Sequence, residues 1–244
     1  MHSLVLRTNR NFNLKPIIMK LTFFGQNAFH IAIGDINIIV DPFISGNDLS
    51  KDKVDINDLK ADFILLTHAH QDHVLDAAAI AKNTGATIVS NYEITKYYET
   101  KGFQTHPMNH GGKWKFPFGE VKYVNAIHTS SFEDGTYGGQ PGGFIIKTSE
   151  KTIYIAGDTA LTMDMKLIPM SYKLDLAILP IGDNFTMGVD DAVIASDFID
   201  CDRIVGCHYD TFGYIKIDKD KAVTTFSEKG KELILLDINE VLEV

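Results

Sequence analysis

The segment Thr67-His68-Ala69-His70-Gln71-Asp72-His73 places three histidines and one aspartate within six residues. It follows the apolar run Phe63-Ile64-Leu65-Leu66, which is typical of a buried strand, and it precedes a helix-like segment that begins at Val74. Imidazole and carboxylate groups are suited to binding zinc and related divalent metals. So many ligand-type side chains at a strand-to-helix junction indicate a metal site rather than a polar surface turn.

Other strand-like runs also end at side chains that can bind metal. The runs 36–40, 121–127, 152–156 and 203–207 are rich in β-branched and aromatic residues, which favour strands. Ligand sites in layered α/β proteins form where the carboxyl ends of strands converge. We therefore expect one shared site that combines the His-rich segment with the side chains that follow these runs: Asp41, His128, Asp158 and His208.

In their order and spacing, these residues resemble the complete motif series of the metallo-β-lactamase superfamily. The matching residues are His68, His70, Asp72, His73, His128, Asp158 and His208, with Asp41 in the position of the first motif. Segments 19–29, 41–44, 157–159 and 179–188 more closely resemble a bacterial branch of metal-dependent hydrolases related to the ascorbate-phosphate lactonases. The resemblance runs from about Met19 to the C-terminus. It implies an α+β fold, a four-layer αββα sandwich of two mixed β-sheets flanked by helices.

The chain shows no internal linker or repeat, so we expect one domain over residues 19–244. Residues 1–18 contain Arg7, Arg10 and Lys15 but no acid, and we interpret them as an N-terminal extension that is flexible or precedes the natural start. Gly34-Asp35 predicts a tight turn between two strands. The remaining patterns predict strands at 21–24, 29–33, 87–89, 143–148, 176–179 and 233–237, and helices at 74–83, 92–101, 192–198 and 220–228.

The composition is that of a soluble cytoplasmic enzyme. The net charge of −9 disfavours a protein that binds a polyanionic backbone, so we expect no nucleic-acid partner. No apolar run approaches the ~20 residues that span a membrane. The two cysteines, Cys201 and Cys207, indicate no disulfide framework, and Cys207 is predicted to be a small core residue. The expected partners are a small-molecule substrate and, by the resemblance, further copies of the chain in a homo-oligomer.

The resemblance implies a binuclear centre with two divalent metal ions, zinc being expected and manganese, iron or nickel also suiting these ligands. In the superfamily a metal-bridged hydroxide attacks the substrate, here a small-molecule ester, lactone or phosphodiester. Asp72, Asp158 and His208 are the candidates for a catalytic role. The implied ligand sets are His68, His70 and His128 for one metal, Asp72, His73 and His208 for the other, and Asp158 as the bridge.

Four further residues are candidates for supporting contacts. Asp41 is expected to orient a ligand histidine through a hydrogen bond. His110 lies in a loop ahead of Gly111-Gly112, Asn184 follows a predicted strand and Tyr209 follows His208, and we expect these three to line the substrate cleft. His106 is predicted to lie in a surface loop.

Three other functions are weighed against hydrolysis of a small molecule. A nuclease or phosphodiesterase of the same superfamily would act on nucleic acid, which the acidic composition disfavours. A non-hydrolytic di-iron redox protein belongs to a branch in which glutamate replaces the second histidine of the motif, and His70 argues against it. A purely structural metal site would leave no open coordination position, whereas seven candidate ligands across two metals leave room for water.

Overall fold

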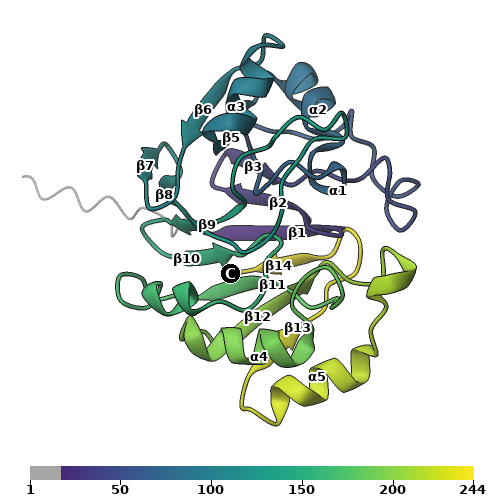
Figure 1. Cartoon of the computed structure of the whole chain (residues 1–244), viewed down its shortest axis with the longest axis vertical. Coiled ribbons are helices and arrows are strands. Elements are labelled where there is room, and N and C mark those ends of the chain that lie inside the picture. Colours follow the sequence, from purple (N-terminus) through teal and green to yellow (C-terminus); the bar gives the residue numbers. More distant parts are fainter. Residues whose placement is uncertain (1–17) are drawn as a thin grey trace, which may run out of the picture.

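The computed structural model describes residues 18–244, which form two β-sheets packed face to face with helices on both outer sides (Figure 1). The predicted N-terminal extension, apart from Ile18, lies outside the described residues. Among residues 18–244, no helix has the length and apolar character needed to cross a membrane.

The first sheet has seven strands in the order β14-β1-β2-β3-β4-β5-β6. Strands β1, β2 and β3 form an antiparallel meander, and β3 to β6 run parallel. Antiparallel neighbours need only tight turns, whereas parallel neighbours need longer crossovers. The bounds are β1 (Met19–Gly25), β2 (Ala28–Ile33), β3 (Ile36–Val40), β4 (Phe63–Leu65), β5 (Thr87–Asn91), β6 (Thr105–Met108) and β14 (Val241–Glu243).

The second sheet also has seven strands, in the order β13-β12-β11-β10-β9-β8-β7. Here β7 to β10 are antiparallel and β10 to β13 are parallel, so both sheets are mixed. The central strand β11 is buried at every position, as expected for a parallel strand covered on both faces. The bounds are β7 (Lys113–Phe116), β8 (Gly119–Asn125), β9 (Gly142–Lys147), β10 (Thr152–Ile155), β11 (Leu176–Pro180), β12 (Arg203–Cys207) and β13 (Glu232–Ile234).

The helices form the two outer layers. In Figure 1, α2 and α3 lie above the first sheet, and α4 and α5 lie below the second. The bounds are α1 (Gln71–Val74), α2 (Ala77–Thr84), α3 (Tyr92–Glu99), α4 (Val189–Phe198) and α5 (Lys219–Ser227), with 3-10 helices η1 (Met163–Leu167) and η2 (Gly213–Ile215).

Three apolar clusters correspond to the three interfaces between the four layers. The central cluster takes side chains from both sheets, including Leu21 and Phe29 from the first and Val121 and Ile153 from the second. The other two clusters lie between each sheet and its helices. Cys207 is buried in the central cluster, which confirms the prediction that it is a small core residue. The predicted four-layer arrangement is therefore confirmed.

Each predicted strand corresponds to an observed one, with ends that differ by a few residues. The strand patterns miss β6, β7 and β14, which are all at the edges of their sheets. Edge strands carry polar side chains and tolerate proline, so β6 (Thr-His-Pro-Met) and β7 (Lys-Trp-Lys-Phe) lack the expected apolar periodicity. The placement of His106 in a surface loop is therefore wrong, because it lies in β6 and packs against Trp114 and Phe116.

The single helix predicted over 74–83 is also wrong, because the chain forms α1 and α2 with a break at Asp76. The backbone nitrogen of Asp76 donates to Pro42 O at 3.1 Å. Its carboxylate accepts hydrogen bonds from the backbone nitrogens of Ile44 and Ser45, at 2.7 and 2.9 Å, and from the Ser45 hydroxyl. These contacts with the loop after β3 replace the intrahelical hydrogen bonds at that point, and no local pattern signals them.

Replacement of Phe29 with alanine tests the central core. The Phe29 side chain is fully buried between the sheets, with its ring centroid 5.0 Å from that of Phe23. Phe29→Ala should lower the free energy of unfolding by about 3–5 kcal/mol, because it removes apolar contacts and leaves a cavity. Urea denaturation would measure this. The control is Trp114→Ala at a side chain that is 55% exposed, where we expect a change of about 0.5 kcal/mol. Equal losses would contradict the assigned core.

Candidate metal centre

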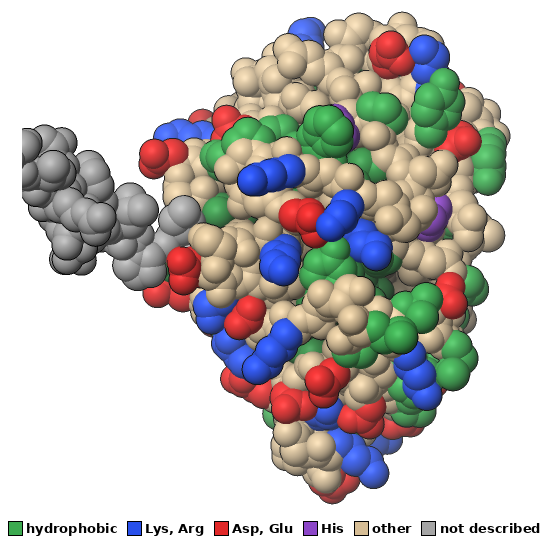
Figure 2. Space-filling model, turned by 90° about the vertical axis from the view of Figure 1, so that its left-hand side faces the viewer, with side chains coloured by type: hydrophobic (Ala, Val, Ile, Leu, Met, Phe, Trp, Pro, Cys, Tyr) green, Lys and Arg blue, Asp and Glu red, His purple; other side chains and the backbone are tan. Residues whose placement is uncertain are grey.

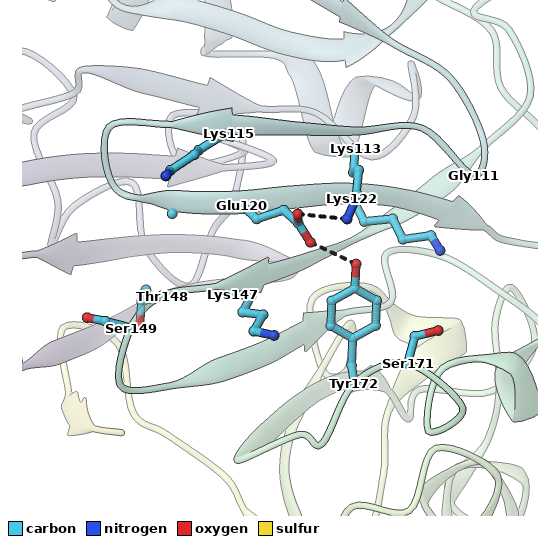
Figure 3. Close-up of a pocket in the computed structure, with 11 residues that line it drawn as sticks. Gly111, Lys113, Lys115, Glu120, Lys122, Lys147, Thr148, Ser149, Ser171 and Tyr172 are labelled. Atoms are coloured by element: carbon cyan, nitrogen blue, oxygen red, sulfur yellow. Dashed lines mark hydrogen bonds and ion pairs between the residues drawn. The ribbon is translucent and has the colours of Figure 1, made fainter.

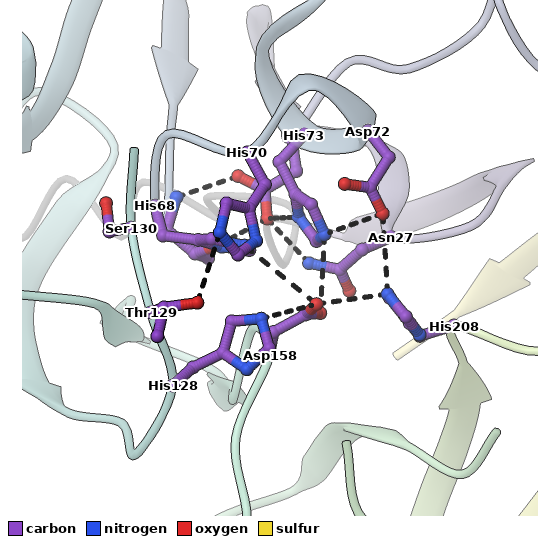
Figure 4. A network of polar contacts seen from close by, with 12 residues as sticks. Asn27, His68, His70, Asp72, His73, His128, Thr129, Ser130, Asp158 and His208 are labelled. Atoms are coloured by element: carbon purple, nitrogen blue, oxygen red, sulfur yellow. Dashed lines mark hydrogen bonds and ion pairs between the residues drawn. The ribbon is translucent and has the colours of Figure 1, made fainter. Parts of the chain in front are cut away.

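Strand ends from both sheets bring seven ligand-type side chains to one place. The loop after β4 and the short helix α1 carry His68, His70, Asp72 and His73. The remaining three follow β8, β10 and β12 of the second sheet: His128, Asp158 and His208. Figure 4 shows their polar contacts converging on the carboxylate of Asp158. The expected convergence of strand ends is therefore what the structure shows.

The ligand atoms of these seven residues fall into two groups, within each of which they lie within 4.8 Å of one another; a third such group, Asp41, His68 and His73, overlaps both. His68, His70 and His128 form the first group, and Asp72, His73, Asp158 and His208 form the second.

The carboxylate of Asp158 contacts both groups. Its Oδ2 lies 3.5 Å from His128 Nε2 in the first group and 3.0 Å from His208 Nε2 in the second. Its Oδ1 lies 3.3 Å from His73 Nε2. Asp158 therefore lies close to imidazole nitrogens of both groups.

Several polar atoms of the centre are left unsatisfied by the protein itself. The buried His73 Nε2 and Asp158 Oδ1 lie 3.3 Å apart, but neither makes a hydrogen bond with suitable geometry to any atom of residues 18–244. His68 Nε2 faces His70 Nδ1 at 3.0 Å. Buried polar atoms are normally paired, and facing imidazole nitrogens are the arrangement that a cation satisfies. The residues present therefore fit a divalent metal ion.

The buried carboxylate of Asp41 orients one histidine of each group. His73 Nδ1 donates to Asp41 Oδ2 at 2.8 Å, which leaves Nε2 aimed into the centre. The Thr67 hydroxyl donates to the same oxygen at 2.5 Å, so it can accept from His68 Nδ1, which lies 3.0 Å away. His68 Nε2 then keeps its lone pair for a metal. Asp41 thus makes the hydrogen bond expected of it.

Burial keeps the first group in the form that binds metal. It lowers the pKa values of His68, His70 and His128, because desolvation disfavours the charged imidazolium. These rings are therefore neutral near pH 7. A neutral imidazole is the form that coordinates zinc and related metals.

The second group is charged in the metal-free protein. Burial alone would lower the pKa of His208, but the carboxylates of Asp158 and Asp72 outweigh it and raise that pKa to about 9. The pKa of His73 is raised well above its usual value for the same reason. In turn, the imidazolium groups hold the pKa values of Asp158 and Asp72 low, although burial opposes this. Protons on His73 and His208 thus balance carboxylate charge that a metal would otherwise neutralise.

Three candidates for substrate contacts lie elsewhere. His110 Nε2 faces the carbonyl oxygen of Pro141 at 2.8 Å and lines a separate cavity. Asn184 is exposed in the turn after β11 and does not line the cavity at the centre. Tyr209 packs into the core between the second sheet and its helices. His208 and Tyr209 are adjacent and project to different sides of the chain, so only His208 reaches the centre.

The sequence analysis missed two residues that support the centre. Gln26 Nε2 donates to Asp72 Oδ2 at 2.8 Å, and Asn27 Nδ2 donates to Asp41 Oδ2 at 2.7 Å. Both lie in the turn between β1 and β2, within the segment that carries the family resemblance. Gln26 is 46 residues from Asp72, so no local pattern predicts the contact.

Five of the ligand-type side chains line an open cavity of about 410 Å³ together with Gln71, Thr129 and three phenylalanines. The phenylalanines are Phe43, Phe185 and Phe212, and the sequence analysis did not single them out. A larger cavity of about 690 Å³ lies away from the centre, along β7, β8 and β9 (Figure 3). Four lysines line it, and none of the seven ligand-type residues does.

The chain is similar to known metal-dependent hydrolases. A family model described as a beta-lactamase superfamily domain matches residues 36–209. A protein of Christiangramia forsetii named UPF0173 metal-dependent hydrolase is 74% identical over 226 residues, which cover 93% of this chain and 100% of the relative. A protein of the same name from Methylacidiphilum infernorum is 46% identical and covers 92% of this chain and 99% of its own. The structure of Igni18, a metallo hydrolase from Ignicoccus hospitalis, is 33% identical with a TM-score of 0.85 and covers 93% of this chain and 98% of that chain.

Asp41→Asn should weaken metal binding without unfolding the protein. Asp41 has φ +40°, a left-handed conformation that asparagine tolerates, but an amide cannot accept all the hydrogen bonds that the carboxylate accepts. We expect metal affinity to fall about 10–100-fold, as measured by competition with a chromophoric chelator. The matched control is Asp35→Asn in the exposed β2–β3 turn, which should bind metal normally. Wild-type affinity in folded Asp41→Asn would contradict the role of Asp41.

Metal binding should release protons in a pH-dependent way. When the pKa of a group is raised in the metal-free state, the group stays protonated at any pH below that pKa. Its proton must then leave when metal binds. Near pH 7, filling the second group should release about two protons, from His73 and His208. Above about pH 9 the His208 proton is already lost, so release should fall by about one. Titration calorimetry in buffers of different ionisation enthalpy would measure the number of protons released. The same number below and above about pH 9 would contradict the prediction.

Proposed function

Because this chain belongs to the beta-lactamase superfamily and is a metal-dependent hydrolase of that family, we propose that it uses two divalent metal ions to hydrolyse a small-molecule ester, lactone or phosphodiester. The observation that supports this is the position of Asp158 between two groups of ligand atoms. Zinc suits the mixed nitrogen and oxygen donors, and manganese, iron or nickel are the alternatives.

The two groups would have different tasks. His68, His70 and His128 would hold one ion through neutral imidazole nitrogens, and Asp72, His73 and His208 would hold the other, with Asp158 shared. Divalent ions bound there supply an activated water for attack and polarise the substrate oxygen.

Supporting residues would hold these side chains in the geometry that the reaction needs. The Asp72 carboxylate is held by Gln26, which leaves its second oxygen to orient the attacking water. Asp41 keeps the lone pairs of His73 and His68 directed into the centre, either directly or through Thr67. Such outer contacts fix ligand orientation and tune the metal.

The open cavity favours a catalytic site over a structural one. A structural zinc site is closed by four protein ligands, whereas a catalytic site keeps a position for water or substrate. Here the ligand-type residues face a cavity of about 410 Å³, which is large enough for a small molecule.

The two cysteines are free and buried, which agrees with a cytoplasmic location.

Nuclease activity is the less favoured alternative. Two-metal sites also hydrolyse phosphodiesters, but proteins that bind nucleic acid neutralise phosphates with lysine and arginine. The net charge is −9, and no lysine or arginine of the described residues lines the cavity. Di-iron redox chemistry is less favoured still, because His70 stands where that branch carries glutamate.

Metal stoichiometry and turnover of ligand variants test the proposal. Elemental analysis of the wild-type protein should find about two divalent ions, and a panel of p-nitrophenyl esters, lactones and bis-p-nitrophenyl phosphate should show turnover that a chelator abolishes. His68→Ala should lose one ion and nearly all turnover. Asp158→Asn should weaken both ions, because Asp158 contacts both groups.

The matched control is His106→Ala on the edge strand β6, which should retain metal and activity. Wild-type turnover by metal-loaded His68→Ala would count against the assigned centre. Unchanged metal content in Asp158→Asn would count against the shared ligand.

A further inference from the structure

Six stretches of chain that line the cavity of the proposed metal centre contain no lysine or arginine, although Lys51, Lys166 and Lys216 directly follow three of them. Each contributes at least one residue to the cavity, and each contains an aspartate or glutamate. The chain as a whole has 23 lysines and arginines, so their absence here is a local feature. The segments are 41–50, 67–75, 128–140, 157–165, 181–188 and 208–215.

Lysines are concentrated on a different face of the molecule. Lys113, Lys115, Lys122 and Lys147 line the groove along β7, β8 and β9, where Glu120 bonds to Lys113 at 3.0 Å (Figure 3). Figure 2 shows blue side chains grouped around a red one on this face. Among residues 18–244, by contrast, no lysine or arginine lines the cavity at the metal centre, so none there would attract an anion.

The cavity is lined by aromatic side chains instead of basic ones. The ring centroids of Phe43 and Phe212 are 6.2 Å apart, and Phe185 lies at the same distance from Tyr214. Phe185 is 48% exposed and Phe212 is 37% exposed. Large apolar side chains grouped at the mouth of a cavity mark a surface that binds an apolar ligand.

These two features disfavour an anionic substrate. Its charged group would find no lysine or arginine among the described lining residues to pair with, and any charge that did not reach the metals would be placed against phenylalanine rings. Asp72 and Asp158 would also offset part of the positive charge of bound metal ions. An uncharged carbonyl compound meets neither penalty, and an apolar substituent gains contact with the rings.

We propose that the substrate is an uncharged carboxylic ester or lactone with an apolar alkyl or aryl group, which binds against Phe43, Phe185 and Phe212. This inference rests on the proposed hydrolase function. Water adds its oxygen to the carbonyl carbon and the carbon–oxygen ester bond breaks. The alkoxide leaves with one proton of that water as an alcohol, and the acid that remains ionises to a carboxylate and a proton.

A matched pair of esters tests the charge preference. p-Nitrophenyl hexanoate and mono-p-nitrophenyl adipate share the reacting ester and the chain length, but the adipate ends in a carboxylate. At low ionic strength, kcat/KM of the metal-loaded protein should be at least about tenfold higher for the hexanoate. Added salt should raise the value for the adipate and leave the hexanoate unchanged, because screening weakens the repulsion. Equal values, or a preference for the adipate at low salt, would overturn the inference.

A charge introduced at the cavity mouth should reverse this selectivity. Phe212→Lys should shift the hexanoate-to-adipate ratio of kcat/KM about tenfold towards the adipate, by removing an apolar contact and adding a cation. The matched control, Phe212→Leu, should keep the preference for the hexanoate. A gain of adipate hydrolysis cannot come from misfolding. Unchanged selectivity in Phe212→Lys would overturn the role of this ring.

Binding to metal-free protein gives a readout that does not depend on turnover. Calorimetry with the non-hydrolysable hexyl p-nitrophenyl ether should show about tenfold weaker binding by Phe212→Lys than by Phe212→Leu. Equal binding would show that Phe212 does not contact the apolar group.

Hydrolysis of bis-p-nitrophenyl phosphate separates this inference from the function on which it rests. Chelator-sensitive turnover of the phosphodiester with none of the hexanoate would leave the hydrolase function intact and overturn the uncharged substrate. Absence of chelator-sensitive turnover on all three substrates would overturn both.

Discussion

The buried carboxylate of Asp41 is the contact on which the geometry of the site depends. It accepts hydrogen bonds from the backbone and hydroxyl of Thr67, from Asn27 and from His73, so it joins the β1–β2 turn, the loop after β4 and helix α1. A buried charge is stable only when it is fully hydrogen-bonded, so these donors must be held in place together. Their arrangement decides which nitrogens of His73 and His68 remain free to bind metal.

The site also depends on the packing of the two sheets. The His-rich segment belongs to the first sheet, whereas His128, Asp158 and His208 follow strands of the second. The central apolar cluster sets the distance between these groups. Asp158, which is buried at that junction, contacts members of both. In the metal-free state, protons on His73 and His208 balance the carboxylates, which couples metal affinity to pH.

Lysines are distributed unevenly over the surface, and this distribution bears on which substrates the cavity would accept. The open face of β7, β8 and β9 carries four lysines, while the loops around the centre carry acids and phenylalanines. The lysines on β7 have a structural role as well, because charged side chains on an edge strand prevent pairing with other chains. Because no lysine or arginine of the described residues lines the cavity, metal ions bound at the centre would be the principal source of positive charge there.

The sequence by itself determined the ligand-type residues, the superfamily and the central strands of both sheets, because these depend on residue type and on local apolar periodicity. It did not predict the edge strands β6, β7 and β14, which lack that periodicity, nor the break at Asp76, which follows from contacts with the loop after β3. The positions of Gln26, Phe185 and Tyr209 relative to the centre were decided only by tertiary structure. Those positions follow from contacts between loops far apart in the chain, and the sheets must pack before such contacts can form.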